Sequence, residues 1–306
     1  MSIMSKRFRE GVSKRLTTML GTYGGSRHAK WLLLAPALLV LVGLLYAPTA
    51  FILQESVRVG SHLGLTHYAS VVVSGYYRSV ALRTLGIGLL VTLLTFALGF
   101  PLAYAAVRGG RLLGGAIVVA TLAPLSVDLV IRTYGWYILL GQGGPVPKLL
   151  VALRVGTVES PPQLLFNTAG IVVGLTHVLL PFMVFPIMTV LHTIPREYEE
   201  AARNLGANRL GVFAHVLLPL ALPGIAAGML LVFTNSIAAY VTPAILGGST
   251  QTLATEITSI FTTTNDWGLG SALAVLLVVV AVCIIVGYQR AMEAAGGAIG
   301  GTGGER

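Results

Sequence analysis

The chain has 306 residues, of which 55% are hydrophobic and only 10% are charged, and its mean hydropathy is +0.83. Soluble domains carry about 25% charged residues, so this composition excludes a soluble globular protein, and the high hydrophobicity excludes a disordered chain. The single cysteine, Cys283, excludes a disulfide scaffold, and the net charge of +9 is therefore first a signal of membrane topology.

Six segments are long and apolar enough to cross a bilayer, which takes roughly 20 residues in a helix. The predicted spans, in chain order, are residues 31–54, 84–107, 112–140, 168–192, 221–243 and 267–289. The first is longer than the 7–15 apolar residues of a cleaved signal peptide, so we expect it to remain as a helix. The predicted fold class is an all-α polytopic membrane protein with six transmembrane helices.

The basic residues predict the orientation of these helices. Fourteen Lys and Arg residues fall in the termini and in the loops on the same side, and five fall on the other side. Because basic loops stay in the cytoplasm, both termini are expected to be cytoplasmic. Residues 1–30 would form a basic cytoplasmic segment, and the Gly-rich residues 291–306 would form a flexible cytoplasmic tail.

The third predicted span carries two charges, Asp128 and Arg132. At a spacing of four they would share one face of a continuous helix, and ionisable groups at membrane depth are candidates for function. Two interpretations are open. The two side chains pair with each other inside the bundle, or they line the substrate path together with Tyr134 and Trp136, with Asp128 facing a cationic solute. These aromatic residues could equally be interfacial anchors.

The loop between the fourth and fifth spans, residues 195–219, is predicted to be helical. Glu197, Glu199 and Glu200 lie in its opening turns, where they favour the positive end of a helix. Gly206 can end that helix, and a second short helix follows at about 208–217. The loop is either a plain interfacial connector or a docking element whose small side chains a cytoplasmic partner could contact.

The same loop carries the EAA motif in an almost complete form. Glu200-Ala201-Ala202 is followed after three residues by Gly206, and after nine more by Val216-Leu217-Leu218-Pro219. This pattern resembles the permease subunits of binding-protein-dependent ABC importers, and only Val216 departs from it, where Ile is usual. Three further segments are similar to the spermidine/putrescine branch of that family: Ile131-Arg132-Thr133-Tyr134-Gly135, Leu180-Pro181-Phe182-Met183 and Asn265-Asp266-Trp267.

The resemblance, which covers about residues 83–290, implies a type I ABC importer permease fold with its core over 84–290 in a bacterial cytoplasmic (inner) membrane. It implies that the loop is a coupling helix seated in a cleft of a separate ATPase subunit. The implied contact residues are Glu200, Ala201, Ala202, Leu205 and Gly206, with Pro219 setting the return into the fifth helix.

The implied partners are an ABC ATPase dimer, a second homologous permease or a second copy of this chain, an extracytoplasmic solute-binding protein and membrane lipid, with no nucleic acid. The implied solute is a polyamine, with opines, iron compounds and phosphonates as alternatives.

No catalytic constellation is found in the sequence. No Gly-Lys dipeptide occurs, so a phosphate-binding P-loop is absent, and the six histidines lack a metal-ligand spacing. We therefore expect a non-catalytic subunit without a metal or cofactor of its own, with ATP and Mg²⁺ bound by the partner ATPase. The alternative from a different class is a self-sufficient secondary transporter, which predicts inverted repeats that the sequence does not show.

Overall fold

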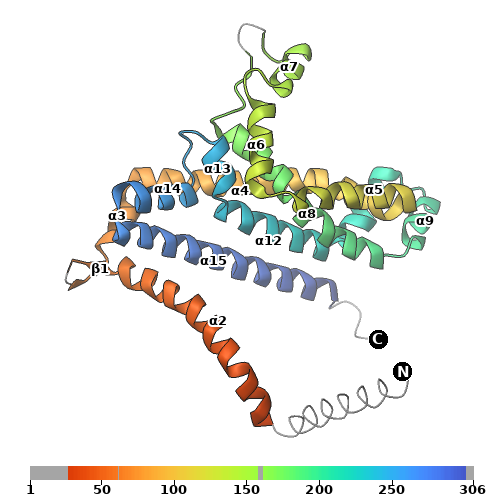
Figure 1. Cartoon of the computed structure of the whole chain (residues 1–306). Coiled ribbons are helices and arrows are strands. Elements are labelled where there is room, and N and C mark those ends of the chain that lie inside the picture. Colours follow the sequence, from red (N-terminus) through yellow and green to blue (C-terminus); the bar gives the residue numbers. More distant parts are fainter. Residues whose placement is uncertain (1–26, 61, 158–160, 301–306) are drawn as a thin grey trace, which may run out of the picture. The chain divides into compact units, whose positions relative to one another are not determined.

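The computed structural model describes residues 27–60, 62–157 and 161–300 (Figure 1). The chain divides into two compact units, Met1–Glu55 and Ser56–Arg306. Helix α2 (Arg27–Ser56) begins in the first unit and contains the span predicted at 31–54. Between Trp31 and Leu53 it carries no charged side chain and is apolar on every face, as suits a helix surrounded by lipid. Most of the predicted basic segment, residues 1–26, lies outside the described residues.

The core of the second unit is built from three long helices, α4 (Gly75–Arg108), α8 (Thr168–Thr193) and α12 (Leu222–Ala238), which lie side by side (Figure 1). Small residues let these helices approach closely, which is how membrane helices pack when burial of apolar surface gives no driving force. A Cβ atom on Gly99 of α4 or Gly228 of α12 would lie within 3.0 Å of the Met183 side chain of α8. Core side chains from all three helices are fully or nearly fully buried: Ile87, Val91, Ile171, Met183, Ile187, Ile225 and Val232.

The third span is broken, so the prediction of one helix over 112–140 is wrong. The segment consists of α5 (Arg111–Leu122), the 3-10 turn η1 (Ala123–Ser126) and α6 (Leu129–Leu140), and α7 (Pro145–Ala152) follows it. The two halves are bent by 104°. Pro124 and the extended backbone at Val127 interrupt the helical hydrogen bonds there, so α6 stands away from the three-helix core (Figure 1).

The approach to the fifth span is bent as well. A short α10 (Arg209–Val212), the π-helical turn η2 (Phe213–Leu217) and α11 (Leu218–Leu220) lead into α12 at an angle of 73°. Helix α12 ends at Ala238, before the predicted end at 243, because the extended residue Ala239 separates it from α13 (Val241–Leu246).

The remaining spans follow the predicted segments with shifted ends. Helix α8 covers the predicted 168–192, whereas α4 begins at Gly75 rather than 84. Helix α15 (Trp267–Gly300) continues into the segment predicted to be a flexible tail, and residues 301–306 lie outside the described part. Among the described residues, four single helices are long and apolar enough to span a membrane, and the two bent pairs bring the number to the predicted six.

A second, smaller hydrophobic core lies where α3 (Thr66–Val73) and α14 (Leu253–Ser259) pack in this unit. The strands β1 (Arg58–Val59) and β2 (His62–Leu63) form an antiparallel pair that precedes α3. The π-helical turn η3 (Ile260–Thr264) follows α14. Helices α3 and α14 and the turn η3 pack with α4 and α15 through one buried cluster: Val71, Val80, Leu253, Ile260 and Leu273.

Candidate functional site

The loop that carries the EAA motif folds as a short helix, α9 (Glu197–Asn204), at the opposite end of the three-helix core from α3 and α14 (Figure 1). Acidic residues in its first turn favour the positive end of the helix. It ends in a Schellman turn: the Gly206 N–H donates to the Arg203 carbonyl and the Ala207 N–H donates to the Ala202 carbonyl. Gly206 has a φ of +92°, which explains the glycine.

The structure brings most of the predicted coupling residues together on α9 and its turn. Glu200, Ala201 and Gly206 are exposed, Ala202 is half-buried, and Leu205 has 89% of its surface exposed. A Cβ atom on Gly206 would meet nothing within 4 Å. The sixth predicted residue, Pro219, lies apart from them along the chain, exposed in α11 just before the 73° bend.

The residue that attaches α9 to α4, Glu199, is not evident from the sequence. Glu199 is 5% exposed, and both of its carboxylate oxygens are occupied by residues of α4. The Tyr104 hydroxyl donates to Oε2 at 2.9 Å, and Arg108 Nε donates to Oε1 at 2.8 Å. These partners are more than 90 positions away in the chain, so a spacing rule for one helix cannot find them, and Glu199 was expected only to favour the helix start.

Arg108 makes further contacts at the end of α4. Its Nη2 donates to the Ile194 carbonyl at 2.8 Å, at the end of α8, and its own carbonyl accepts from Arg196 Nη2 at 3.3 Å. Arg203 approaches Glu199 only to 3.9 Å and is largely exposed, so it contributes little. The buried carboxylate is thus paired and hydrogen-bonded, as burial of a charge requires.

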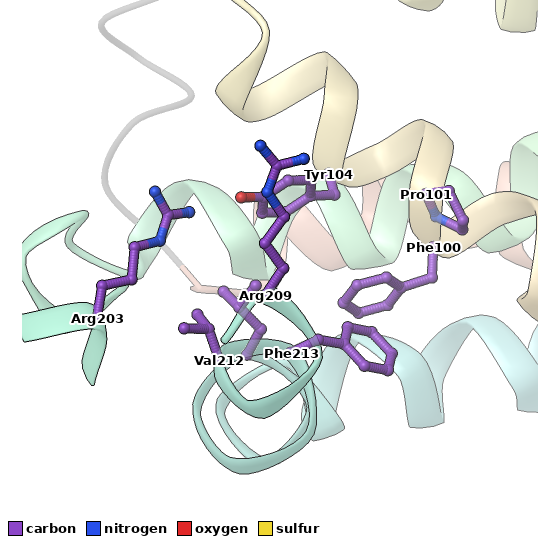
Figure 2. A pocket seen from close by; sticks show the side chains of 8 residues that line it. Phe100, Pro101, Tyr104, Arg203, Arg209, Val212 and Phe213 are labelled. Carbon is purple, nitrogen blue, oxygen red and sulfur yellow. The ribbon is translucent and has the colours of Figure 1, made fainter. Parts of the chain in front are cut away.

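A cavity of about 370 Å³ opens beside this cluster, between α4, α10 and η2 (Figure 2). Its floor is aromatic, since the rings of Phe100 and Phe213 meet edge to face with centroids 4.9 Å apart. Its lining residues are Phe100, Pro101, Tyr104, Arg203, Arg209, Val212, Phe213 and Leu217.

Asp128 and Arg132 do not pair, so the interpretation that they neutralise each other is wrong. Asp128 is the exposed N-cap of α6, and its Oδ1 accepts from the Val130 N–H at 2.8 Å. The chain is extended at Asp128, which turns its side chain to the helix start rather than toward Arg132. The Nε and Nη1 atoms of Arg132 are buried and have no hydrogen-bond partner in the described part of the chain.

The two aromatic residues predicted beside them point to different surroundings. The Trp136 ring meets the His177 ring of α8 edge to face at 5.5 Å, whereas Tyr134 is exposed and stands beside Tyr137. The four predicted substrate-path residues thus make different contacts, and their place in a solute path stays a prediction. Among the described residues, no group of three or more His, Cys, Asp or Glu side chains is placed to hold a metal ion.

Comparison with known proteins supports the interpretation of the motif. The family model described as "Binding-protein-dependent transport system inner membrane component" matches residues 146–293. The spermidine/putrescine transport system permease protein PotB of Escherichia coli (strain K12) is 30% identical over 216 residues, which cover 70% of this chain and 78% of that protein. The putative 2-aminoethylphosphonate transport system permease protein PhnU of Salmonella choleraesuis (strain SC-B67) is 32% identical over 218 residues, covering 68% and 73%.

Solved structures agree on the fold. A chain of a bacterial ABC transporter involved in the import of the acidic polysaccharide alginate has a TM-score of 0.64 at 16% identity, covering 92% of this chain and 97% of that one. A chain of the MetNI methionine ABC transporter has a TM-score of 0.51 at 21% identity, covering 72% and 99%. The predicted type I importer permease fold is thereby confirmed. This multi-pass membrane protein belongs to the family of binding-protein-dependent transport system inner membrane components, as an ABC importer permease that resembles the PotB branch.

Proposed function

We propose that α9 docks this permease onto a separate ATPase, which binds ATP and Mg²⁺ and drives import. The observation that carries the proposal is the two-sided character of this helix. Its inner side is held to α4 through Glu199, while Ala201 and Leu205 face outward. A leucine that is 89% exposed in a water-facing turn is unfavourable alone and becomes favourable in a protein contact. The open Gly206 turn beside it permits close approach.

The proposal includes the other subunits of an importer. A second permease completes the solute path, and an extracytoplasmic protein delivers the solute. A related structure supports the latter, since it holds an alginate ABC transporter in complex with an alginate pentasaccharide-bound periplasmic protein. The excess of basic residues on one side supports the proposal that both termini and α9 lie in the cytoplasm. To test this orientation, a cysteine is introduced at Ser5 in a chain that also carries Cys283→Ser. An impermeant thiol reagent added to intact cells should not label this cysteine. Labelling would overturn the proposed orientation.

The favoured solute is a polyamine, because the PotB relatives are spermidine/putrescine permeases. A second candidate is a zwitterionic organophosphonate, as in the PhnU relative. One feature of the structure favours this candidate: the guanidinium of Arg132 has two buried nitrogen atoms without partners. Near the solute path, such a group attracts an anion and repels a polycation. The solute is tested by uptake of labelled putrescine, spermidine and 2-aminoethylphosphonate in cells with and without the gene for this chain.

Docking is tested by purifying the tagged chain from its native membrane in mild detergent and identifying the proteins that come with it. We expect an ATPase with the wild-type chain and its loss in Gly206→Asp, because the charged side chain prevents close approach. Gly60→Asp is the matched control: Gly60 also has a positive φ (+61°) and open space around its Cβ position, but it lies between β1 and β2. If the ATPase stays bound to Gly206→Asp, or never accompanies the wild-type chain, α9 is not the docking element.

A further inference from the structure

Helix α9 has a bend at each end. Upstream, Ile194 is extended and Pro195 follows it, so α8 does not continue into α9. Downstream, Gly206 is in the left-handed region, which turns the chain sharply. Neither connection transmits a displacement as a continuous helix does. The position of α9 relative to the membrane helices therefore depends on its noncovalent contacts.

The contact that ties α9 to α4 is a buried cluster of three side chains, which we call the Glu199 clamp: Glu199, Tyr104 and Arg108. Tyr104 and Arg108 are four residues apart, so both lie on one face of the last turns of α4. Each takes a different oxygen of the Glu199 carboxylate, at 2.9 Å and 2.8 Å. Two bonds to one planar group restrict its rotation as well as its distance, which is the geometry of a rigid joint.

From this geometry we infer that Glu199 is a positioning residue that makes α9 and the C-terminal end of α4 move as one body, so that movement of a docked ATPase reaches the membrane core through α4. The inference rests on the docking function proposed above. The inference gives two neighbouring acidic residues different roles. Glu200 is exposed and therefore accessible to a partner, whereas Glu199 is buried and bonded to α4.

Helix α4 is suited to receive such a movement because it is part of the tightly packed core. Gly99 lies against Met183 of α8, and a Cβ atom on Gly88 would lie 2.8 Å from Ile237 of α12. Packed helices without voids shift together rather than deform. An alternative route runs from α9 to α12 through α10 and η2, which α9 also contacts. That route passes a π-helical turn and a 73° bend before it reaches α12, and both can absorb displacement.

The clamp is not accounted for by stability alone. Replacing a buried ion pair by packed apolar side chains is often neutral or stabilising, so an ion pair at this place contributes defined geometry between two elements. A positioning role and a purely structural role therefore differ in a measurable way. The positioning role predicts that the distance between α9 and α4 stays constant while the transporter changes state.

The experiment measures this distance in the purified complex with its ATPase by pulsed electron paramagnetic resonance. Spin labels are placed at Asn204 on α9 and at Leu98 on α4, both exposed, in a chain with Cys283→Ser. We expect a narrow distance distribution that is the same without nucleotide and with ATP bound. In Glu199→Gln, which keeps the shape of the side chain and removes its charge, we expect a distribution about twofold broader that shifts when ATP binds.

Glu197→Gln is the matched control, because Glu197 lies in the same helical turn but is exposed; it should behave as the wild-type chain does. A wild-type distance that shifts with ATP overturns the inference, and so does a Glu199→Gln distribution that is as narrow and constant as the wild type. Both outcomes are read in complexes that retain the ATPase. Absence of the ATPase from the wild-type preparation is a different result: it refutes the docking proposal itself, and the inference with it.

Discussion

Replacing Arg108 with methionine would leave the Glu199 carboxylate buried without its charge partner. The expected loss of stability is larger than for an exposed ion pair, because the side chains of Arg108 and Glu199 are only 13% and 6% exposed. Removing one partner of a buried pair costs about 3–5 kcal/mol. The carbonyl of Ile194, a buried residue, also loses its donor, which places the expected cost at the upper end of that range. Tyr104→Phe removes one hydrogen bond to the same carboxylate and should cost less, about 1.5–3 kcal/mol.

The double variant Glu199→Met with Arg108→Met tests the reasoning further. If Arg108→Met is destabilising because it leaves the Glu199 carboxylate buried without a charge partner, removing that carboxylate should restore most of the lost stability. The free energy of unfolding of the double variant should then be no more than about 2 kcal/mol below that of the wild type. The assay is equilibrium unfolding in mixed detergent and SDS micelles, followed by circular dichroism, for the wild type, both single variants and the double variant. A double variant that loses the sum of the two single losses would refute the reasoning, as would an Arg108→Met variant within about 0.5 kcal/mol of the wild type.

Three smaller predictions use the same assay or uptake. Arg203→Ala should change stability by less than about 0.5 kcal/mol, since this exposed side chain only approaches Glu199; a loss like that of Arg108→Met would place it inside the clamp. Gly228→Leu should lower the free energy of unfolding by at least about 1–3 kcal/mol, because the new side chain would meet both the backbone and the side chain of Met183. An unchanged stability would mean that α8 and α12 are not in contact. Asp128→Asn should keep both stability and solute uptake, whereas Asp128→Ala should cost about 1 kcal/mol, because asparagine also caps a helix; loss of uptake in the asparagine variant would return this carboxylate to the solute path.

The predicted helices agree with the structure where a local property decides. The span predicted at 168–192 begins at the first residue of α8 and ends one residue before the end of α8. The agreement is close because apolar length and the polar residues that bound it are local features of the sequence. Helix α4 begins earlier than predicted because Arg78 and Arg83 limit the apolar span but not the helix. The motif around Gly206 predicted the end of α9, since a left-handed residue there favours glycine for steric reasons.

The third span shows the limit of that approach. Hydropathy over 112–140 reads as one helix, and Pro124 alone does not reveal a 104° bend, because many membrane helices contain proline. Whether the chain kinks slightly or breaks depends on what the two halves pack against. In this structure Trp136 contacts His177 of α8, and α6 leaves the core. One of the two interpretations of Asp128 and Arg132, that they pair with each other, fails for the same reason, since it assumes a continuous helix.

The amino-acid sequence by itself determined the class of this protein, its six membrane-spanning segments and, through the EAA spacing, the importer family to which it belongs. All three depend on composition, on the length of apolar segments or on fixed short spacings between residues, and each of these is a property of the linear sequence. Only the tertiary structure showed that Glu199, rather than the motif residue Glu200, ties α9 to the membrane core. Tyr104 and Arg108 lie far from Glu199 in the chain, and a buried carboxylate finds such partners only when distant helices have packed together.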